Sequence, residues 1–512
     1  MTESNAERLR VLGAAAVILL LVLAAGTAST MSIVVAFTIV VTVGLFLVPK
    51  FTFAVIGAFL LVQPVFVNLA GSSTTPLGLA LHRLHQAFTV AAAVRIVVFM
   101  SWGRVAPQLR LWVWLMSAFV ALGVGSGLMQ QVPLTTLALG AFLAVKFPVF
   151  FLAALTVSWN ERDCERLVRG ALWLGPFLFG TGVIIWMLPS EVQNVFVDQT
   201  LETESYGREL FNAMQGIFSH PGVFGWASAV TGCYAVAALL VGRPGWRAIA
   251  TGSLVSSIGG ILASLRRRPL LALPAVTLYG VIRFAKGRRR WTVLALFAML
   301  AAGAAWVMVG RLEAEYRDAV TYVDPTAPTA PRVLLYVAGV DIANTRFPLG
   351  AGFGRFGGYA SVLDYSPLYD QYGFSSVWGL SADDPYYLQD TYWPHIAAET
   401  GWLGAAILLA FFLLLVERAS RAALGAADVA TKTVAVAAVL VLLESLIESL
   451  AGPVFEVALF SYAIAVPLGI TLARSYSWPS LGLGHEQEQN HEVGPLGHGE
   501  PDRESQQPLP PQ

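Results

Sequence analysis

The chain has 512 residues, of which 56% are hydrophobic and only 12% are charged, and its mean hydropathy is +0.65. A soluble domain carries about 25% charged residues, so this composition excludes an ordinary soluble protein and indicates a chain that folds in lipid. The formal net charge is zero, which argues against a nucleic-acid partner. The only cysteines, Cys164 and Cys233, fall in an inner loop and inside an apolar run, so no disulfide framework is expected.

Apolar runs recur from near the first residue to about residue 473, and each is close to the roughly 20 residues that cross a bilayer as a helix. They predict an all-α fold, a polytopic membrane helical bundle of about fourteen transmembrane helices. The expected spans are 11–28, 31–48, 51–68, 86–102, 109–127, 135–157, 167–187, 217–241, 246–264, 269–285, 291–310, 395–416, 431–451 and 454–473. The first run is followed at once by a second and has no small-residue cleavage site, so we expect it to be retained.

The Lys/Arg content of the short loops predicts the orientation, because such residues gather on the cytoplasmic side. With the N-terminus inside, the inner turns hold Lys50 and the basic residues near 104–110, 162–169, 243–247, 283–290, 418–421 and 474. The outer turn 129–135 has no charge, and the outer loop 188–216 is acidic. Both termini are therefore expected in the cytoplasm.

One outer turn departs from this rule. The segment Ser264 to Pro269 contains Arg266, Arg267 and Arg268 and is expected outside the membrane. A miscounted span would explain it, but that error would spoil several neighbouring loops. Guanidinium groups bind phosphate oxygens bidentately and stay charged, so we expect an anionic, phosphate-bearing ligand at this turn. Arg208 is expected on the same side. His220, also there, is interpreted as a helix cap more readily than as a base.

Two segments do not read as spans. Residues 311–394 form an outer loop rich in glycine and aromatic residues, which suits a folded, sugar-stacking surface. Residues 475–512 are polar and are expected to form a disordered cytoplasmic tail. The predicted organisation is thus N-terminal transmembrane helices in 1–204, core transmembrane helices with the arginine turn in 205–310, the loop 311–394, C-terminal transmembrane helices in 395–474, and the tail.

Charges inside spans are costly and mark either function or a buried partner. Such residues here are Arg95, Lys146, Glu399, Glu444, Glu448 and Glu456. Two interpretations remain open at this point, structural ion pairs or an outward-open polar cavity. The segment Pro348 to Phe356 contains a GxGxxG-like pattern, but it does not lie in a βαβ unit, so a nucleotide loop is rejected.

The outer-face features together resemble the O-antigen ligase and O-antigen (polysaccharide) polymerase family of bacterial membrane glycosyltransferases. The matching segments are the Ser-Arg turn Ser264 to Arg268, the "G-x-F-x-H-P" segment Gly216 to Pro221, the loop helix Arg332 to Asp341, the segment Pro348 to Phe356, and the closing residues Asp390, Trp393, Glu399, Gly401 and Gly404. The resemblance covers about residues 205–420. Where ligases of the family carry a His-Asn pair, this chain has Asp390 and Thr391, which favours a chain polymerase.

This resemblance implies a GT-C-like enzyme of the bacterial plasma (inner) membrane that builds cell-envelope polysaccharide. Its substrate would be a glycan carried on undecaprenyl or another polyprenyl pyrophosphate, and partners in polysaccharide export or chain-length control fit that role. Inverting transfer at the outer face would need no metal and no other cofactor. The leaving pyrophosphate would be neutralised by Arg266, Arg267 and Arg268 with Arg208, Arg332 and Arg355. Asp390, or alternatively His395 or Glu399, would take the proton from the acceptor hydroxyl.

Three other functions are compatible with the sequence. A transporter or flippase of lipid-linked oligosaccharide would share the substrate, although no internal repeat supports it. A ligase that transfers glycan to protein, lipid or a cell-wall acceptor would share the chemistry. A scaffold of an export complex would need neither the arginines nor Asp390.

Overall fold

The computed structural model describes residues 30–71, 75–101, 107–189, 192–193, 213–285 and 331–475, with scattered residues between 287 and 302. All of them belong to one compact unit, Met1–Tyr476. Within these residues the chain is helical and contains no strand. The helices are α2 (Thr30–Leu47), α3 (Pro49–Leu69), α4 (Pro76–Ser101), α5 (Pro107–Met129), α6 (Leu134–Leu155), α7 (Glu161–Met187), α9 (Pro221–Val241), η2 (Pro244–Trp246), α10 (Arg247–Ala263), α11 (Arg267–Phe284), α13 (Pro331–Thr345), α14 (Tyr359–Leu363), α15 (Pro367–Gln371), η3 (Phe374–Ser376), α16 (Trp393–Gly425), α17 (Val429–Glu448), η4 (Ser449–Ala451) and α18 (Ala458–Ser475).

Ten of the described helices are long and apolar enough to cross a membrane, as expected of a multi-pass membrane protein. They are α2 to α7, α9 and α16 to α18, and each coincides with a predicted span. The predicted spans 246–264 and 269–285 coincide with α10, which has 17 residues, and with α11, which carries three arginines. The run 11–28 lies outside the described residues, and 291–310 is described only at scattered positions. The count of fourteen therefore stays a prediction.

Several helices continue past the ends of the predicted spans, because polar residues that end an apolar run need not end a helix. α4 begins at Pro76, ten residues before the predicted span, and includes His82, Arg83 and His85. α7 begins at Glu161 because Asn160 and Asp163 form a capping box. α16 runs on to Gly425, with an ion pair between Glu417 and Arg421 at 2.5 Å on its last turns.

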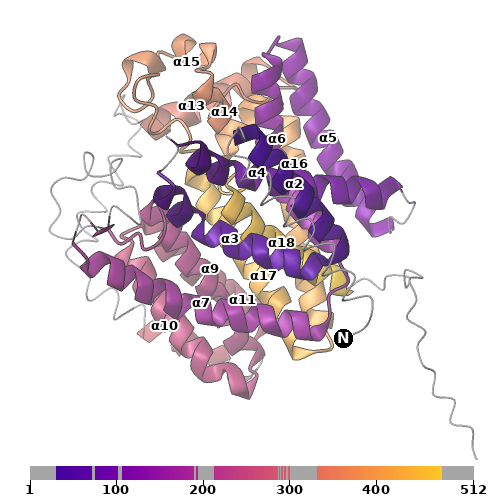
Figure 1. Cartoon of the computed structure of the whole chain (residues 1–512), viewed down its shortest axis with the longest axis vertical. Coiled ribbons are helices and arrows are strands. Elements are labelled where there is room, and N and C mark those ends of the chain that lie inside the picture. Colours follow the sequence, from indigo (N-terminus) through magenta and orange to yellow (C-terminus); the bar gives the residue numbers. More distant parts are fainter. Residues whose placement is uncertain are drawn as a thin grey trace, which may run out of the picture. The chain divides into compact units, whose positions relative to one another are not determined.

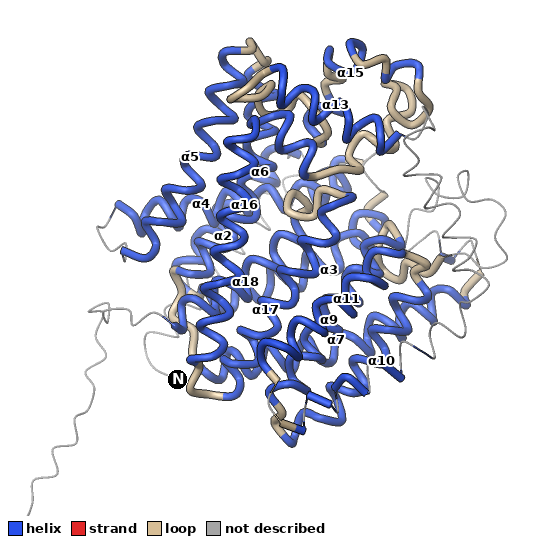
Figure 2. The backbone as a smooth tube through the Cα atoms, turned by 180° about the vertical axis from the view of Figure 1, so that it is seen from behind, coloured by secondary structure: helices blue, strands red, loops and turns tan. Residues whose placement is uncertain are grey.

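Two helices lie in the interior of the bundle. α9 contacts α7, α10, α11 and α17, and α17 in turn contacts α16 and α18 (Figures 1 and 2). In its most apolar stretch 89% of the residues of α9 are buried, against 17% for α2. Because lipid tails are as apolar as leucine, such burial depends on close packing by small residues, and α9 is rich in Ala and Gly.

Ion pairs tie several helix termini together at one end of the bundle. Lys50 of α3 contacts Asp163 of α7 at 2.6 Å, and Arg243 after α9 contacts Glu165 at 3.0 Å. Arg474 at the end of α18 contacts Asp428, the N-cap of α17, at 3.0 Å. These residues fall in turns that the sequence assigns to the cytoplasm. Which side of the membrane they occupy stays a prediction.

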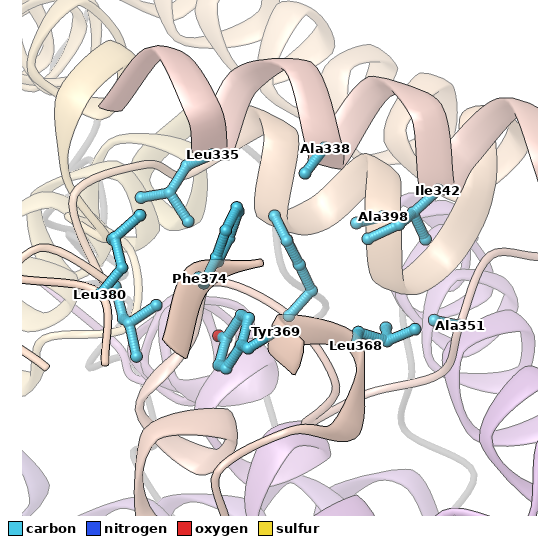
Figure 3. Packing of buried hydrophobic residues seen from close by; sticks show 11 residues of the cluster. Leu335, Ala338, Ile342, Ala351, Leu368, Tyr369, Phe374, Leu380 and Ala398 are labelled. Carbon is cyan, nitrogen blue, oxygen red and sulfur yellow. The ribbon is translucent and has the colours of Figure 1, made fainter. Parts of the chain in front are cut away.

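The other end of the bundle carries the segment 331–394, which folds around a small core of its own. α13 supplies Leu335, Ala338 and Ile342, and these pack on Tyr369 of α15 and Phe374 of η3 (Figure 3). α13 also contacts α16, and α14 contacts α6, so this core is seated on the bundle. The rest of the predicted loop, 311–330, lies outside the described residues.

Aromatic residues of this segment divide into two groups. Tyr369 and Tyr392 are buried, and Tyr365, Tyr372 and Tyr387 pack against the core. Trp378 and Tyr386 remain largely exposed, with ring centroids 6.1 Å apart, and Tyr359 is also exposed. Most aromatic residues of this segment thus help to build its folded core, and Phe347 is exposed together with Tyr359, Trp378 and Tyr386.

Candidate functional site

The arginine turn is a tight link between α10 and α11. α10 ends at Ala263, and the Ser264 hydroxyl donates to the Ile261 carbonyl at 2.7 Å. Leu265 then takes a left-handed backbone conformation, with a φ of 54°, which reverses the chain within two residues. The Arg266 amide donates to Ser264 Oγ at 3.4 Å, and α11 begins at Arg267. Three consecutive arginines are thus presented at one helix start.

Arg266 lies beside the cap of α9. His220 is the N-cap of that helix, and its Nδ1 accepts from the Gly222 amide at 2.9 Å, as the sequence interpretation of His220 as a cap expected. Its Nε2 lies 3.3 Å from Nη2 of Arg266. A neutral imidazole that accepts at Nδ1 carries its proton at Nε2. The Arg266 guanidinium and the His220 imidazole are therefore in direct contact at the start of α9.

Arg268 reaches the end of α17. Its Nη1 donates to the Ala451 carbonyl at 2.6 Å and lies 3.5 Å from Oε2 of Glu448. The arginine side chain is 38% exposed, whereas the Glu448 side chain is 7% exposed. The guanidinium therefore contacts a buried carboxylate although the arginine side chain is partly exposed.

Arg332 approaches the same place from α13. Its Nη2 donates to Oδ2 of Asp390 at 2.5 Å, and both side chains are about one-third exposed, at 34% and 30%. One turn further along α13, the Tyr336 hydroxyl donates to the Leu450 carbonyl. Burial raises the pKa of Tyr336, and the positive charges of Arg332 and Arg268 act in the opposite direction. The turn 264–269, the end of α17 and the start of α13 thus meet around η4.

We call Arg266, Arg267, Arg268 and Arg332 the arginine cluster. Arg266, Arg268 and Arg332 lie close to one another here, and Arg267 is included because it belongs to the same turn. These are four of the six arginines that the sequence predicted for a pyrophosphate. Arg208 lies outside the described residues. Arg355 lies in the segment that precedes α14, and its backbone bonds to Glu399 instead. The neighbouring Trp393 belongs to the rim of the cluster, since its Nε1 donates to Ser449 Oγ at 3.0 Å.

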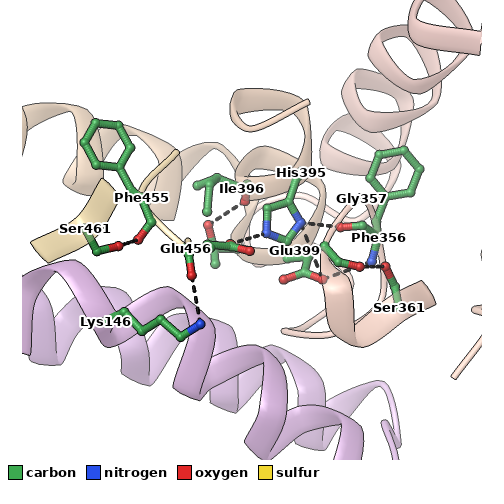
Figure 4. Close-up of polar contacts among 12 residues, drawn as sticks. Lys146, Phe356, Gly357, Ser361, His395, Ile396, Glu399, Phe455, Glu456 and Ser461 are labelled. Carbon is green, nitrogen blue, oxygen red and sulfur yellow. Dashed lines mark hydrogen bonds and ion pairs between the residues drawn. The ribbon is translucent and has the colours of Figure 1, made fainter. Parts of the chain in front are cut away.

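A second group of charges, the buried network, consists of Lys146, His395, Glu399 and Glu456. His395 Nε2 lies 2.8 Å from Oε1 of Glu456, and its Nδ1 faces the Phe356 carbonyl and, at 3.7 Å, Oε1 of Glu399 (Figure 4). Since both ring nitrogens face acceptors, both act as donors, and the imidazolium form fits this geometry.

The remaining contacts of the buried network tie three parts of the chain together. Oε1 of Glu399 accepts from the Phe356 amide at 3.0 Å, and Lys146 Nζ donates to the Glu456 carbonyl at 2.8 Å (Figure 4). The side chains of His395 and Glu399 are only 4% and 1% exposed. The network therefore fastens the segment 348–358 and the start of α18 to α16 and α6, and it leaves no open face to a substrate.

These contacts separate the three residues that the sequence offered as a base. Asp390 is partly exposed and borders the arginine cluster. His395 and Glu399 are enclosed in the buried network, and their geometry is that of an anchor.

The sequence also left open whether the charges inside spans form ion pairs or line a cavity. The structure pairs His395 with Glu456 and Arg268 with Glu448, whereas Arg95 bonds to the Thr156 hydroxyl at 2.8 Å and to the Leu45 carbonyl.

No protein-family model matches this chain, and a search of curated protein sequences finds no match either. The functional assignment therefore depends on the geometry of the site and on the resemblance of its motifs.

Proposed function

We propose that this protein transfers glycan from a polyprenyl-pyrophosphate carrier by metal-independent, inverting glycosyl transfer at the outer face of the plasma membrane, as a chain polymerase. The observation that carries the proposal is the arginine cluster: Arg268 of α11 contacts η4, Arg332 lies one turn before Tyr336 of α13, which also contacts η4, and both arginine side chains are partly exposed. A diphosphate is the ligand whose charge and geometry match several guanidinium groups at once.

In this mechanism the acceptor hydroxyl oxygen bonds to the anomeric carbon of the donor sugar as the bond from that carbon to the pyrophosphate oxygen breaks. The electron pair stays on the leaving pyrophosphate. The Arg266 guanidinium lies beside His220, and Arg268 and Arg332 add positive charge nearby. Donors positioned before the reaction stabilise developing charge without reorganisation, and such stabilisation is usually the largest single catalytic contribution.

Other parts of the site have supporting roles. Asp390 holds Arg332 through its carboxylate and so orients that guanidinium. His395 and Glu399 anchor the segment before α14 to α16. The exposed rings of Trp378 and Tyr386 offer faces on which sugar rings can stack. The breaking of the sugar–pyrophosphate bond supplies the driving force, so ATP is not consumed.

The direct test is an elongation assay with purified protein in lipid vesicles and a synthetic polyprenyl-pyrophosphate oligosaccharide. We expect longer glycans on the lipid in the absence of any ion gradient or nucleotide. Movement of the unaltered substrate across the vesicle membrane, without elongation, would show a transporter instead.

A second experiment distinguishes a polymerase from a ligase. After deletion of the gene, single repeat units should accumulate on polyprenyl pyrophosphate if the protein is a polymerase. Long chains that remain unattached to their final acceptor would indicate a ligase.

A further inference from the structure

Glu444 and Glu448 form a pair of buried carboxyl groups one turn apart on α17. Oε2 of Glu444 accepts from Ser445 Oγ at 3.3 Å, and Oε2 of Glu448 faces Arg268 at 3.5 Å. The other oxygen of each carboxyl group, Oε1, is buried and has no hydrogen-bond partner among the residues that the structure describes. A buried carboxylate oxygen without a donor is costly, so it calls for a ligand or a proton.

The pair lies directly beside the arginine cluster. Arg268 contacts Glu448, and both Arg266 and Arg268 are close enough to Glu448 to interact with it electrostatically. Glu444 lies one turn deeper, next to Ser445, whose hydroxyl accepts from Trp226 Nε1 at 3.3 Å. Arg268 thus places a positive charge on the Glu448 side of the pair.

The other carboxyl groups of this region are already engaged. Asp390 is held by Arg332 at 2.5 Å, and Glu399 and Glu456 are enclosed in the buried network with His395. Glu448 also faces an arginine, Arg268, through its Oε2, but its Oε1 has no hydrogen-bond partner among the described residues. Glu448 combines a carboxylate oxygen without a donor with direct contact to the arginine cluster.

We propose that Glu448 is the general base of the transferase, an inference that rests on the proposed function. The proton of the acceptor hydroxyl passes to Oε1 of Glu448 as the acceptor oxygen bonds to the anomeric carbon. The electron pair of the broken bond leaves on the pyrophosphate, which Arg266 and Arg268 stabilise. The proton then passes from Glu448 to water after product release. Arg268 links the two events, because the same guanidinium borders the base and the leaving group.

The test compares Glu448→Gln, Glu448→Asp and Glu444→Gln in the elongation assay, with Glu417→Gln as the matched control. Glu417 is a glutamate on α16, exposed and paired only with its neighbour Arg421 in the described contacts. Loss of general-base help lowers the rate by about 10²–10⁴-fold, so we expect that loss in kcat for Glu448→Gln. Binding of polyprenyl pyrophosphate alone should be unchanged. Glu448→Asp should keep part of the rate, and Glu417→Gln should keep all of it.

Two further readouts separate a base from a structural residue. The acidic limb of the wild-type pH–rate profile should be absent from the residual activity of Glu448→Gln. Formate should restore part of the elongation rate of Glu448→Ala, because it supplies a carboxylate in the vacated space.

The inference is overturned if Glu448→Gln elongates at the wild-type rate, or if it loses binding of polyprenyl pyrophosphate together with elongation. If these variants do not accumulate in the membrane, the wild-type protein is treated with an apolar carbodiimide, and the adduct is located by mass spectrometry. An adduct on Glu448 with undiminished elongation also overturns the inference. A wild-type protein that neither binds nor elongates lipid-linked oligosaccharide refutes the proposed function itself, which distinguishes the two failures.

Discussion

The arginine cluster and the buried network are both groups of charges in a membrane protein, yet they are built in opposite ways. The arginines keep partly exposed side chains, at 38% for Arg268 and 34% for Arg332. Arg268 contacts the Ala451 carbonyl and the buried Glu448 carboxylate, and Arg332 contacts the partly exposed Asp390. In the buried network each charge is enclosed and faces a partner from another segment. Exposed ion pairs are weak and easily exchanged for a ligand, whereas a broken buried pair is strongly destabilising. The partly exposed arginine side chains therefore suit ligand binding, whereas the enclosed charges of the buried network hold the fold together.

The largest expected effect on stability comes from the buried network. His395→Ala removes the partner of Glu456 and Glu399, and removal of one partner from a buried ion pair costs about 3–5 kcal/mol. The measurement is the free energy of unfolding by SDS titration in mixed micelles. His82→Ala on the exposed face of α4 is the control and should change this free energy by less than about 0.5 kcal/mol. Equal stability of the two variants would remove the basis for calling the network an anchor.

The arginine cluster should show the reverse pattern, a loss of activity without a loss of stability. Arg266→Ala removes one donor to the leaving group, which lowers the elongation rate by about 10²–10³-fold. Its unfolding free energy should change by no more than about 1 kcal/mol, because the side chain is partly exposed. Arg283→Ala, at the opposite end of α11, is the matched control and should keep full activity. Long polymer in single replacements of Arg266, Arg267 and Arg268 alike would rule out the phosphate clamp.

Gly401 tests how tightly the segment before α14 is held against α16. Its backbone has a φ of 68° and a ψ of 177°, a break inside α16, and a Cβ there would lie 2.0 Å from the Pro348 carbonyl oxygen. Gly401→Ala should destabilise the protein by about 2–3 kcal/mol, because only glycine adopts this conformation readily. Gly373 also has a positive φ, of 70°, but a Cβ there meets no atom within 4 Å. Gly373→Ala should therefore cost only about 1–2 kcal/mol. The two variants are compared by SDS titration, and equal losses would mean that the close contact with Pro348 is unimportant.

The smallest effect is expected at the opposite end of the bundle. Asp428 accepts from the Thr431 amide at 2.7 Å and from Arg474 at 3.0 Å. Burial opposes the ionised form, but these hydrogen bonds outweigh it and lower the pKa of Asp428. The stability that its carboxylate contributes is thus present above its ordinary pKa and is lost as the pH falls through the lower, folded-state value.

Asp428→Ala should cost about 1 kcal/mol, the usual effect of a lost N-cap, whereas Asp428→Asn should cost less because asparagine also caps helices. Unfolding measured between neutral and acid pH checks both statements. The part of the unfolding free energy that is lost at acid pH through Asp428 should be absent from both variants. If it persists in Asp428→Asn, it belongs to another titrating group.

The sequence predicted the apolar helices well, because a bilayer imposes length and hydropathy on every span. It also placed the turn of Arg266 and the loop helix of Arg332 on one side. In the structure Arg268 of that turn and Tyr336 of that helix both contact η4. The pairing of charges could not be predicted. Lys146 and Glu456 are 310 residues apart, and the lysine bonds to a backbone carbonyl, which carries no signal in the residue pattern.

The ends of the helices were also beyond the reach of hydropathy, for a physical reason visible in α4. His82, Arg83 and His85 lie just before the apolar run, so hydropathy places the start of the span after them. Their backbone groups still gain helical hydrogen bonds, and the helix therefore begins earlier, at Pro76. Gln63 of α3 stabilises this extension by donating to the Leu81 and His82 carbonyls at 2.9 Å. The sequence identified Glu444 and Glu448 as unusual charges inside a span. Their proposed part in proton transfer rests on the unpartnered carboxyl oxygens, which only the structure shows.

The contrast between α2 and α9 has a consequence for how such a protein tolerates change. α2 is the most hydropathic of the ten apolar helices and the least enclosed, whereas α9 is surrounded on nearly every side and includes Ser228, Thr231 and Cys233. Substitutions along α2 have only to keep the helix apolar, since fluid acyl chains accommodate side chains of any shape. Along α9 each added methyl group would displace a neighbouring helix, so close packing limits which substitutions this helix can accept.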